Sequence, residues 1–419
     1  MSAGVRGDEV PVWVVGTFDT KAAELRYLAS LLERAGVPVF TVDISTRRGS
    51  RVDGVSANML ATTVAAHHER GADHVLGGDD RGQAVIRMGE ALSTLVRERH
   101  QAGAIAGMIG IGGSGGTSMI APALHVLPYG MPKLLISTLA SGIMTPFVDV
   151  YDIMVLNPVT DLAGLNRLSK AILANAAHAM AGMVRHSVHS ADGEAPTVSF
   201  GTLGLSMFGV TTECVQEVSR RLSADYECQV FHANGTGGRT MEALARAGML
   251  DAIVDITTTE VGQNLAGGVC DAGPDRLAAA ADLGLPWVGS VGALDMINWG
   301  PPATIPPKYE GRRFHTHNAQ VTLMRATGQE LALAGERIAT RLNASPGIVH
   351  LLLPLKGLSA LDAPGKPFHD PEANQCLFSA LERHFIPSPH HRLEALPLHI
   401  NDKAFAAAVA QALRHALAR

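Results

Sequence analysis

The sequence AIAGMIGIGGSGGTSMIAPAL at residues 104–124 decides the fold of this chain. Its first part, Ala104–Ile111, is short and apolar, which predicts a buried strand. The glycine run after it predicts a tight turn, and Thr117–Leu124 predicts the helix that this turn opens. A strand, a glycine-rich turn and a helix in this order are typical of α/β proteins, in which parallel strands alternate with helices.

The same alternation extends outward from this segment. Val12–Gly16 and Val37–Ile44 predict strands on either side of a helix in Lys21–Ala35, which makes a βαβ unit with parallel strands. Further strands are expected at 133–138, 152–156, 197–201, 228–232, 252–257, 286–291, 348–353 and 392–398, and further helices at 57–70, 82–100, 165–184 and 403–419. We therefore expect an α/β fold of two Rossmann-like three-layer domains, with mostly parallel sheets and an interdomain cleft.

The chain is too long for one ordinary core, since it has 419 residues. We expect an N-terminal Rossmann-like nucleotide-binding domain over 1–190 and a C-terminal Rossmann-like α/β domain over 191–419, with a polar linker at His186–Pro196. The proline-rich segment Gly292–Asn318 predicts an irregular excursion. It is either functional or a surface that packs against the other domain or a second subunit.

Composition excludes several classes of function. The formal net charge is -5, and no basic stripe is present, so nucleic-acid binding driven by phosphate neutralisation is not expected. No apolar run is long enough to span a membrane. The four cysteines are scattered without a CxxC pair, and no secretory signal begins the chain, so we expect a reduced, cytoplasmic protein.

The glycine turn is the strongest chemical signal. Backbone N–H groups at a helix start favour an anion, and glycine lets the backbone approach a phosphate closely. The run matches GxGxxG, but no acid follows within about 30 residues, and Gly116 stands where a P-loop would have lysine. We expect phosphate binding without a conventional dinucleotide site or P-loop; the alternative is a turn that serves helix–sheet packing. The nucleotide-binding candidates here are Gly112, Gly113, Ser114, Gly115, Gly116 and Thr117.

Two more turns, at 16–21 and 137–142, should open at the same edge of the sheet, because the carboxyl ends of parallel strands lie together. Lys21 would neutralise a phosphate, Asp19 would hold Mg²⁺ through water, and Asp43 is placed where a ribose-binding acid lies in related folds. Helix capping is the alternative for Asp19 and Thr20, and Asp43 is alternatively an N-cap or a solvated loop acid. The candidates in these segments are Thr17, Phe18, Asp19, Thr20, Lys21, Asp43, Thr138, Ser141 and Gly142.

The second domain has a comparable turn, HANGTGGRT at 232–240. Arg239 beside it would bind a carboxylate or phosphate, and Glu260 at the end of the next strand would line the same cleft as an acid or base. The substrate-binding candidates are Asn234, Gly235, Thr236, Gly237, Gly238, Arg239 and Glu260. The catalytic residues are not identified by the sequence; Lys21, Arg239 and Glu260 are candidates. His315 and His317 share a face if their segment is a strand, but no metal-site spacing supports them, so no metal site is predicted.

Several motifs resemble one known family. GTFDTK (16–21), GIGGSGGTSM (110–119), STLASG (137–142), HANGTGGRTME (232–242) and TTTEVGQNLAGGVCDAG (257–273) are similar to the ATP-binding domain of the tomato mosaic virus resistance protein and its bacterial relatives. The resemblance covers nearly the whole chain. It implies two Rossmann-like subdomains, ATP on the glycine turns of the first, and a homodimer. It does not carry over the antiviral role, which depends on a viral partner.

We therefore expect an ATP-binding protein, with Mg²⁺ as a further candidate ligand. The first hypothesis is an ATP-dependent enzyme acting on a small phosphate- or carboxylate-bearing metabolite in the interdomain cleft. The second is a non-catalytic, nucleotide-sensing module that acts through a protein partner. The third is an ATP-independent isomerase or lyase of a phosphorylated substrate.

Overall fold

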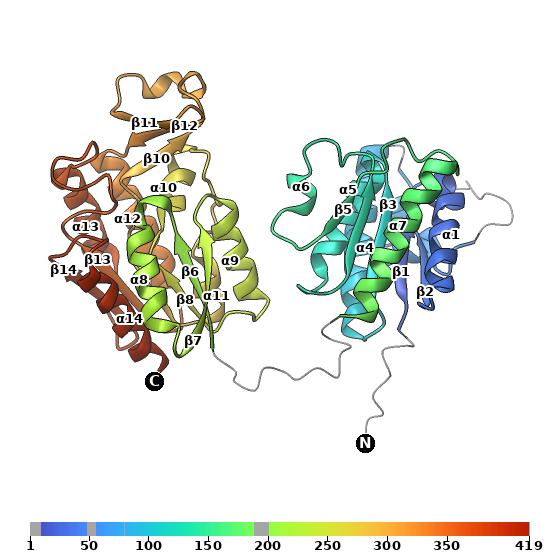
Figure 1. The fold of residues 1–419 in the computed structure, drawn as a ribbon, viewed down its shortest axis with the longest axis horizontal. Helices are drawn as coiled ribbons and strands as arrows, with labels where there is room; N and C mark the ends of the chain where they lie inside the picture. Colours follow the sequence, from blue (N-terminus) through green and yellow to red (C-terminus); the bar gives the residue numbers. More distant parts are fainter. Residues whose placement is uncertain (1–9, 48–55, 79, 188–200, 419) are drawn as a thin grey trace. The chain divides into compact units, whose positions relative to one another are not determined.

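A computed structural model describes residues 10–47, 56–78, 80–187 and 201–418. The chain divides into two compact units, Met1–Ala195 and Pro196–Arg419, called here the N-terminal and C-terminal units (Figure 1). The expected boundary at 190–191, most of the expected linker and most of the strand expected at 197–201 lie outside the described residues. Each unit is a layered α/β structure with a parallel central sheet, so the predicted fold class is confirmed.

The N-terminal unit is built on a five-stranded sheet. Its strand order is β2-β1-β3-β4-β5, and every neighbouring pair is parallel. The strands are β1 (Val12–Gly16), β2 (Val39–Asp43), β3 (Gly107–Gly112), β4 (Lys133–Ser137) and β5 (Met154–Leu156). The chain therefore runs from β1 toward one edge of the sheet and from β3 toward the other edge. This reversal of direction makes a topological switch point at the carboxyl ends of β1 and β3.

Helices cover both faces of this sheet. Val12 and Val14 of β1 share a core with α1 and α7, whereas Trp13 and Val15 share another with α4 and α5. The helices are α1 (Phe18–Arg34), α2 (Ala61–Ala65), α3 (Ala72–Leu76), α4 (Arg81–Gln101), α5 (Ser114–Val126), α6 (Thr145–Val148) and α7 (Arg167–Arg185). The helix expected over 57–70 is wrong in extent: only the short α2 lies within this range, and α3 begins beyond it, at Ala72.

The C-terminal unit repeats this plan with six parallel strands in the order β14-β13-β9-β8-β6-β7. They are β6 (Gly201–Met207), β7 (Tyr226–His232), β8 (Ala252–Asp255), β9 (Trp287–Gly289), β13 (Val349–Pro354) and β14 (His391–Leu396). β6 continues to Met207, beyond the end of the strand expected at 197–201. Leu203 and Leu205 there are fully buried, so their alternation marks the strand.

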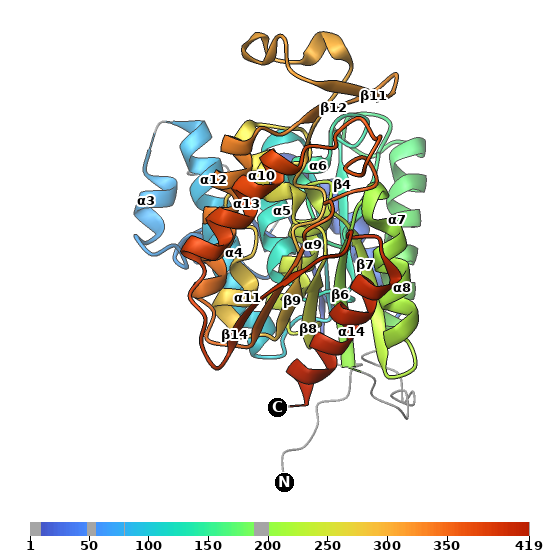
Figure 2. The ribbon, with the colours of Figure 1, turned by 90° about the vertical axis from the view of Figure 1, so that its left-hand side faces the viewer.

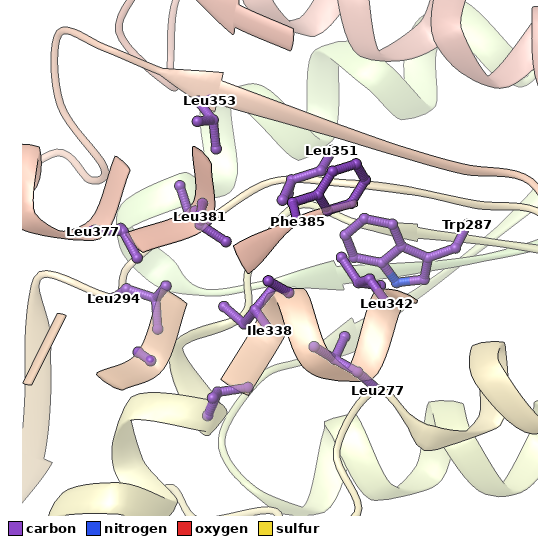
Figure 3. Packing of buried hydrophobic residues seen from close by; sticks show 14 of the residues in the cluster. Leu277, Trp287, Leu294, Ile338, Leu342, Leu351, Leu353, Leu377, Leu381 and Phe385 are labelled. Atoms are coloured by element: carbon purple, nitrogen blue, oxygen red, sulfur yellow. The ribbon is translucent and has the colours of Figure 1, made fainter. Parts of the chain in front are cut away.

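Two apolar cores hold the helices of this unit to the sheet. One core lies under α8 and α14; Figure 2 shows α14 in front of the strands and α8 to their right, beside β7. Figure 3 shows the other, where Trp287 of β9 lies among Leu342 and Ile338 of α12 and Phe385 just after α13. The helices are α8 (Thr212–Leu222), α9 (Thr236–Arg246), α10 (Thr259–Ala266), α11 (Ala278–Leu283), α12 (Gly328–Asn343), α13 (Pro371–His384) and α14 (Lys403–Leu417).

The segment expected to be irregular, Gly292–Asn318, forms much of a small antiparallel sheet. Its order is β10-β12-β11, from β10 (Met296–Trp299), β11 (Phe314–Asn318) and β12 (Val321–Arg325). We call this sheet and its connections the arm; it lies at the top of the C-terminal unit in Figure 1. Strand pairing across about 20 residues was not visible in local patterns, because the prolines lie between the strands.

Buried Arg325, at the end of β12, fixes the arm to the rest of the unit. Its Nε donates to the carbonyl oxygen of Phe368 at 2.7 Å, and its Nη2 donates to Oδ1 of Asn374 at 2.8 Å. Its Nη1 donates to the carbonyl oxygens of Ala326 at 2.9 Å and Asp295 at 3.3 Å. These bonds satisfy a buried cation and tie the arm to α13.

Asp295, just before β10, is a buried acid with an incomplete set of partners. Its Oδ2 accepts from the Ser359 hydroxyl at 2.8 Å, but its Oδ1 has no hydrogen-bond partner among the described residues. Burial and the nearby carboxylate of Asp362 raise the pKa of Asp295 to about 7, although Arg325 acts in the opposite direction. The folded chain therefore holds a proton on Asp295 that the unfolded chain would release in mildly acidic solution.

We predict that this group makes the C-terminal unit less stable as the pH rises. The free energy of unfolding should fall by up to about 4 kcal/mol between about pH 4 and pH 7, because only the folded state keeps the proton. Asp295→Asn removes this contribution, so the variant should gain stability relative to the wild type as the pH rises from about 4 to about 7. Urea unfolding of both proteins over this range measures the difference.

Glu336→Gln, at an exposed position on α12, is the matched control, since it removes an acid that stays in water. The prediction would be contradicted if the free energies of unfolding of the wild type and of Asp295→Asn differed by the same amount at every pH.

Candidate functional site

The predicted glycine turn and the turn after β1 lie side by side in the N-terminal unit. Gly16 at the end of β1 pairs with Ile111 of β3, so the residues that follow the two strands emerge next to each other. The connection after β1 leads to α1 on one face, and the connection after β3 leads to α5 on the other. Ligands bind at such divergence points in open α/β sheets.

Two glycines of this region are required by packing. A Cβ on Gly112 would lie 2.5 Å from the backbone nitrogen of Thr117, and a Cβ on Gly110 would lie 2.5 Å from Cγ2 of Ile120. Side chains at these positions would push α5 away from β3. Gly110 and Gly112 are therefore explained by the structure of the unit alone.

The other three glycines are not explained in this way. A Cβ on Gly113, Gly115 or Gly116 would meet no atom closer than 3.6 Å, which is ordinary contact. Gly113 has φ -80° and ψ -161°, a conformation open to any residue, and neither Gly115 nor Gly116 has a positive φ. Packing and backbone geometry would both accept side chains at these three positions.

Helix α5 begins three residues earlier than expected, at Ser114 rather than Thr117. Gly115 and Gly116 therefore lie in its first turn, where glycine is a poor helix former. The N-cap is Gly113, and no side chain caps the turn. The first backbone N–H groups of a helix have no partner within the helix, so they are available to an anion.

Other candidates around the turn have mixed roles. Thr117 is buried, and its hydroxyl lies 2.7 Å from that of Ser137, so it links α5 to β4. Oγ1 of Thr138 lies 3.8 Å from the position of a Cβ on Gly113, which makes Thr138 part of the wall. Ser141 and Gly142 are exposed in the loop that follows.

The turn after β1 is held largely by contacts within the unit. Asp43, expected to bind a ribose, accepts the backbone N–H of Phe18 at 3.1 Å and the hydroxyl of Ser45 at 2.5 Å, so it stabilises the start of α1. Phe18 is buried in the core, so its side chain is not available to a ligand. The hydroxyls of Thr17 and Thr20 lie 2.8 Å apart.

Asp19 and Lys21 retain features of a binding site. Oδ1 of Asp19 is buried and has no hydrogen-bond partner among the described residues. Such a group in a native structure requires an explanation, and a missing ligand or ion is one. Nζ of Lys21 donates to the carbonyl oxygen of Leu162 at 2.6 Å, which uses one of its three N–H donors.

The glycine turn of the C-terminal unit differs, because the protein fills it with its own carboxylate. Oε1 of Glu260 accepts from the backbone N–H groups of Gly235 at 2.7 Å and Gly238 at 3.0 Å. A Cβ on Gly238 would clash with this carboxylate, and a Cβ on Gly237 would clash with the carbonyl oxygen of His232. Gly235 has φ +96°, so packing and conformation explain all three glycines.

Glu260 belongs to a buried ionic cluster that we did not predict. Arg276 donates from Nη1 and Nη2 to the two oxygens of Asp255, each at 2.7 Å, and from Nε to Glu260 at 2.7 Å. Its Nη1 also approaches Glu242 at 3.3 Å. Burial raises the pKa of Glu260, although Arg276 and the turn N–H groups act in the opposite direction. No sequence pattern indicated this cluster, because Arg276 is a single arginine in a loop and belongs to no recognisable motif.

This cluster corrects our expectation for the second domain. Glu260 is fully buried and engages Gly235, Gly238 and Arg276, so the structure does not support its role as an acid or base facing a cleft. The N–H groups expected to bind a substrate are occupied by Glu260. Asn234 accepts the N–H of Gly237 at 3.2 Å. Thr236 accepts at its carbonyl from Thr240, and Arg239 is half-buried on α9.

Within the described ranges, no group of three or more His, Cys, Asp or Glu residues is arranged to hold a metal ion. His315 and His317 both lie on β11. No helix in the part of the chain that the structure describes combines the length and hydropathy needed to cross a membrane.

Comparison with known proteins gives matches over nearly the whole chain. The model of the uncharacterised protein family (UPF0261) N-terminal domain matches residues 10–189, and that of the C-terminal domain matches residues 201–417. The chain is 50% identical over 399 residues to a UPF0261 protein of Mesorhizobium japonicum, covering 95% of this chain and 97% of that protein. It is 49% identical over 403 residues to one of Rhizobium meliloti, covering 96% and 98%. It is 42% identical over 412 residues to the ToMV resistance protein Tm-1 of Solanum lycopersicum, covering 95% of this chain and 54% of that protein.

We predict that Arg276 is a major determinant of the stability of the C-terminal unit. Arg276→Gln leaves three buried carboxyl groups without their cation, so the free energy of unfolding should fall by roughly 3–5 kcal/mol. Chemical unfolding of the full chain, followed by tryptophan fluorescence, measures it; Trp287 and Trp299 report on the C-terminal unit and Trp13 on the N-terminal unit. Arg220→Gln, which breaks a surface pair with Glu217, should have a much smaller effect, because water and salt screen such pairs. Equal effects of the two substitutions would show that the buried cluster contributes no more than a surface pair.

Proposed function

The chain belongs to the uncharacterised protein family UPF0261, and we propose that its N-terminal unit binds the phosphate groups of a nucleotide, ATP, on the first turn of α5. One observation carries this proposal. Gly113, Gly115 and Gly116 are glycines at positions where neither packing nor backbone conformation calls for glycine.

Retaining Gly115 and Gly116 in the first turn of α5 has an energetic cost. Each glycine within a helix destabilises it by up to about 1 kcal/mol relative to alanine. A compensating function is the direct approach of the backbone to a ligand, which a Cβ would block. The uncapped N–H groups and the dipole of α5 favour an anion at this place. The C-terminal unit offers an internal comparison, because its glycine turn receives a carboxylate of the chain itself.

The neighbouring residues fit a nucleotide with its cation. Thr138 would lie beside the phosphates, and Lys21 has donors left to offset their charge. The unpartnered Oδ1 of Asp19 fits a magnesium ion held through water. When bound, Mg²⁺ would neutralise part of the phosphate charge. ATP is the nucleotide that the resemblance of the glycine turns implies.

A nucleotide-sensing module that acts through a partner is the role supported best. Glu260, the candidate acid or base of the second domain, is enclosed by its own unit, and the anion-binding N–H groups beside it are occupied. An ATP-dependent enzyme acting on a small phosphate- or carboxylate-bearing metabolite is the second candidate. The placement of Lys21 at the same sheet edge as the glycine turn favours it. The homodimer remains a prediction.

We predict that Gly115→Ala separates folding from binding. The substitution should raise the free energy of unfolding without ligand by up to about 1 kcal/mol, because alanine is the better helix former. It should weaken ATP binding by about tenfold or more, because the new methyl group stands between backbone and phosphate. Thermal unfolding without nucleotide, and calorimetric titration with ATP and Mg²⁺, measure the two effects.

Gly112→Ala is the matched control. Its Cβ would meet the backbone of α5 at 2.5 Å, so this variant should be destabilised. Unchanged ATP affinity in a well-folded Gly115→Ala protein would refute the proposed site. Release of phosphate, diphosphate or a modified metabolite from ATP by the wild type, lost in Gly115→Ala, would favour the enzyme over the sensing module.

A further inference from the structure

A hollow of about 380 Å³ lies near the glycine turn in the N-terminal unit. Two arginines line it, Arg47 after β2 and Arg81 in the first turn of α4. The remaining lining residues are Thr46, Leu76, Gly77, Gly78 and Ala84. We call this hollow the arginine pocket.

The arginine pocket adjoins the proposed phosphate site. Ala84 of α4 lines the pocket, and its neighbour Val85 is the residue that a Cβ on Gly115 would contact, at 3.7 Å. The pocket also follows the end of β2, which is separated from β3 only by β1. Two strand spacings are about 10 Å, so one extended ligand can reach both places.

Arg81 is available to an anion. Within the ranges that the structure describes, its side chain makes no ion pair or hydrogen bond. The neighbouring acid Asp80 is engaged in capping α4, since its Oδ1 accepts from the backbone N–H groups of Gly82 at 2.8 Å and Gln83 at 3.2 Å. Arg87, six residues further along α4, donates to the carbonyl oxygen of His74 at 3.0 Å.

The chemistry of the pocket matches a phosphoryl group. A guanidinium group presents a planar set of N–H donors that bind phosphate in pairs, and its charge persists at every physiological pH. Asp43, the acid expected to bind a ribose at this end of β2, accepts instead from Phe18 and Ser45. Cationic side chains therefore line the hollow near a place where ribose-binding folds present a carboxylate.

We propose that the arginine pocket binds a second phosphoryl group of the ligand whose first phosphate lies on α5. This inference rests on the proposed function. It narrows the ligand to nucleotides that carry two separated phosphoryl groups. The second group is either the far end of a polyphosphate chain or a phosphate on the ribose. Arg47 and Arg81 are then specificity-determining residues.

Calorimetric titration of the full chain at one salt concentration tests this inference. The ligands are AMP, ATP, adenosine 2′,5′-bisphosphate and adenosine 3′,5′-bisphosphate. We expect at least one of the last three to bind about tenfold or more tightly than AMP, as a charge-assisted contact predicts. A preference for ATP would assign the pocket to the polyphosphate chain, and a preference for a bisphosphate would assign it to the ribose phosphate.

Arg81→Gln should remove this advantage while leaving AMP affinity within about twofold, because AMP has no second phosphate to lose. Arg47→Gln should act in the same direction. Arg97→Gln is the matched control, since it removes an exposed charge from the same helix about 24 Å away. Equal losses in Arg81→Gln and Arg97→Gln would overturn the inference, as would equal affinities of the wild type for all four ligands.

The outcomes separate this inference from the proposed function. Binding that is lost in Gly115→Ala but unchanged in Arg81→Gln would overturn the arginine pocket alone. No binding of any of the four nucleotides by the folded wild type would overturn both.

Discussion

Helix α5 can lie directly against β3 because Gly110 and Gly112 have no side chains. This close approach sets the position of the first turn of α5 beside the end of β1, where the chain connections diverge. Three candidates take their places from that turn: Thr138 lies beside it, and Asp19 and Lys21 follow the adjacent strand β1. The packing of one helix on one strand therefore organises the proposed site.

The two glycine turns show that one sequence signature can serve two physical purposes. In the C-terminal unit, the glycines make room for Glu260 and nearby backbone, and the anion they receive is part of the chain. In the N-terminal unit, three glycines leave space that no side chain fills. An anion-binding turn that is satisfied internally is a structural device, whereas an unsatisfied one at a sheet switch point is a candidate site.

Arg276 explains why the internal arrangement persists. Asp255, Glu242 and Glu260 come from different elements, and each would be costly to bury without a cation. Their shared guanidinium joins β8, α9 and α10 in one cluster, which also holds Glu260 in the turn. The arm is attached in a similar way through Arg325. Buried arginines thus position loops that apolar packing alone would leave free.

Local patterns were enough to predict the α/β class and most strands, because short apolar runs bounded by glycine and helical periodicity are properties of neighbouring residues. They also located the glycine turn. Only the tertiary structure showed that α5 starts at Ser114, that 296–325 builds a sheet, and that Glu260 is enclosed by Arg276. The tertiary structure was also needed to distinguish the glycines that packing requires from those beside which a side chain would fit. These properties depend on which atoms from distant segments meet, and a linear pattern contains no information about the space beside a missing Cβ.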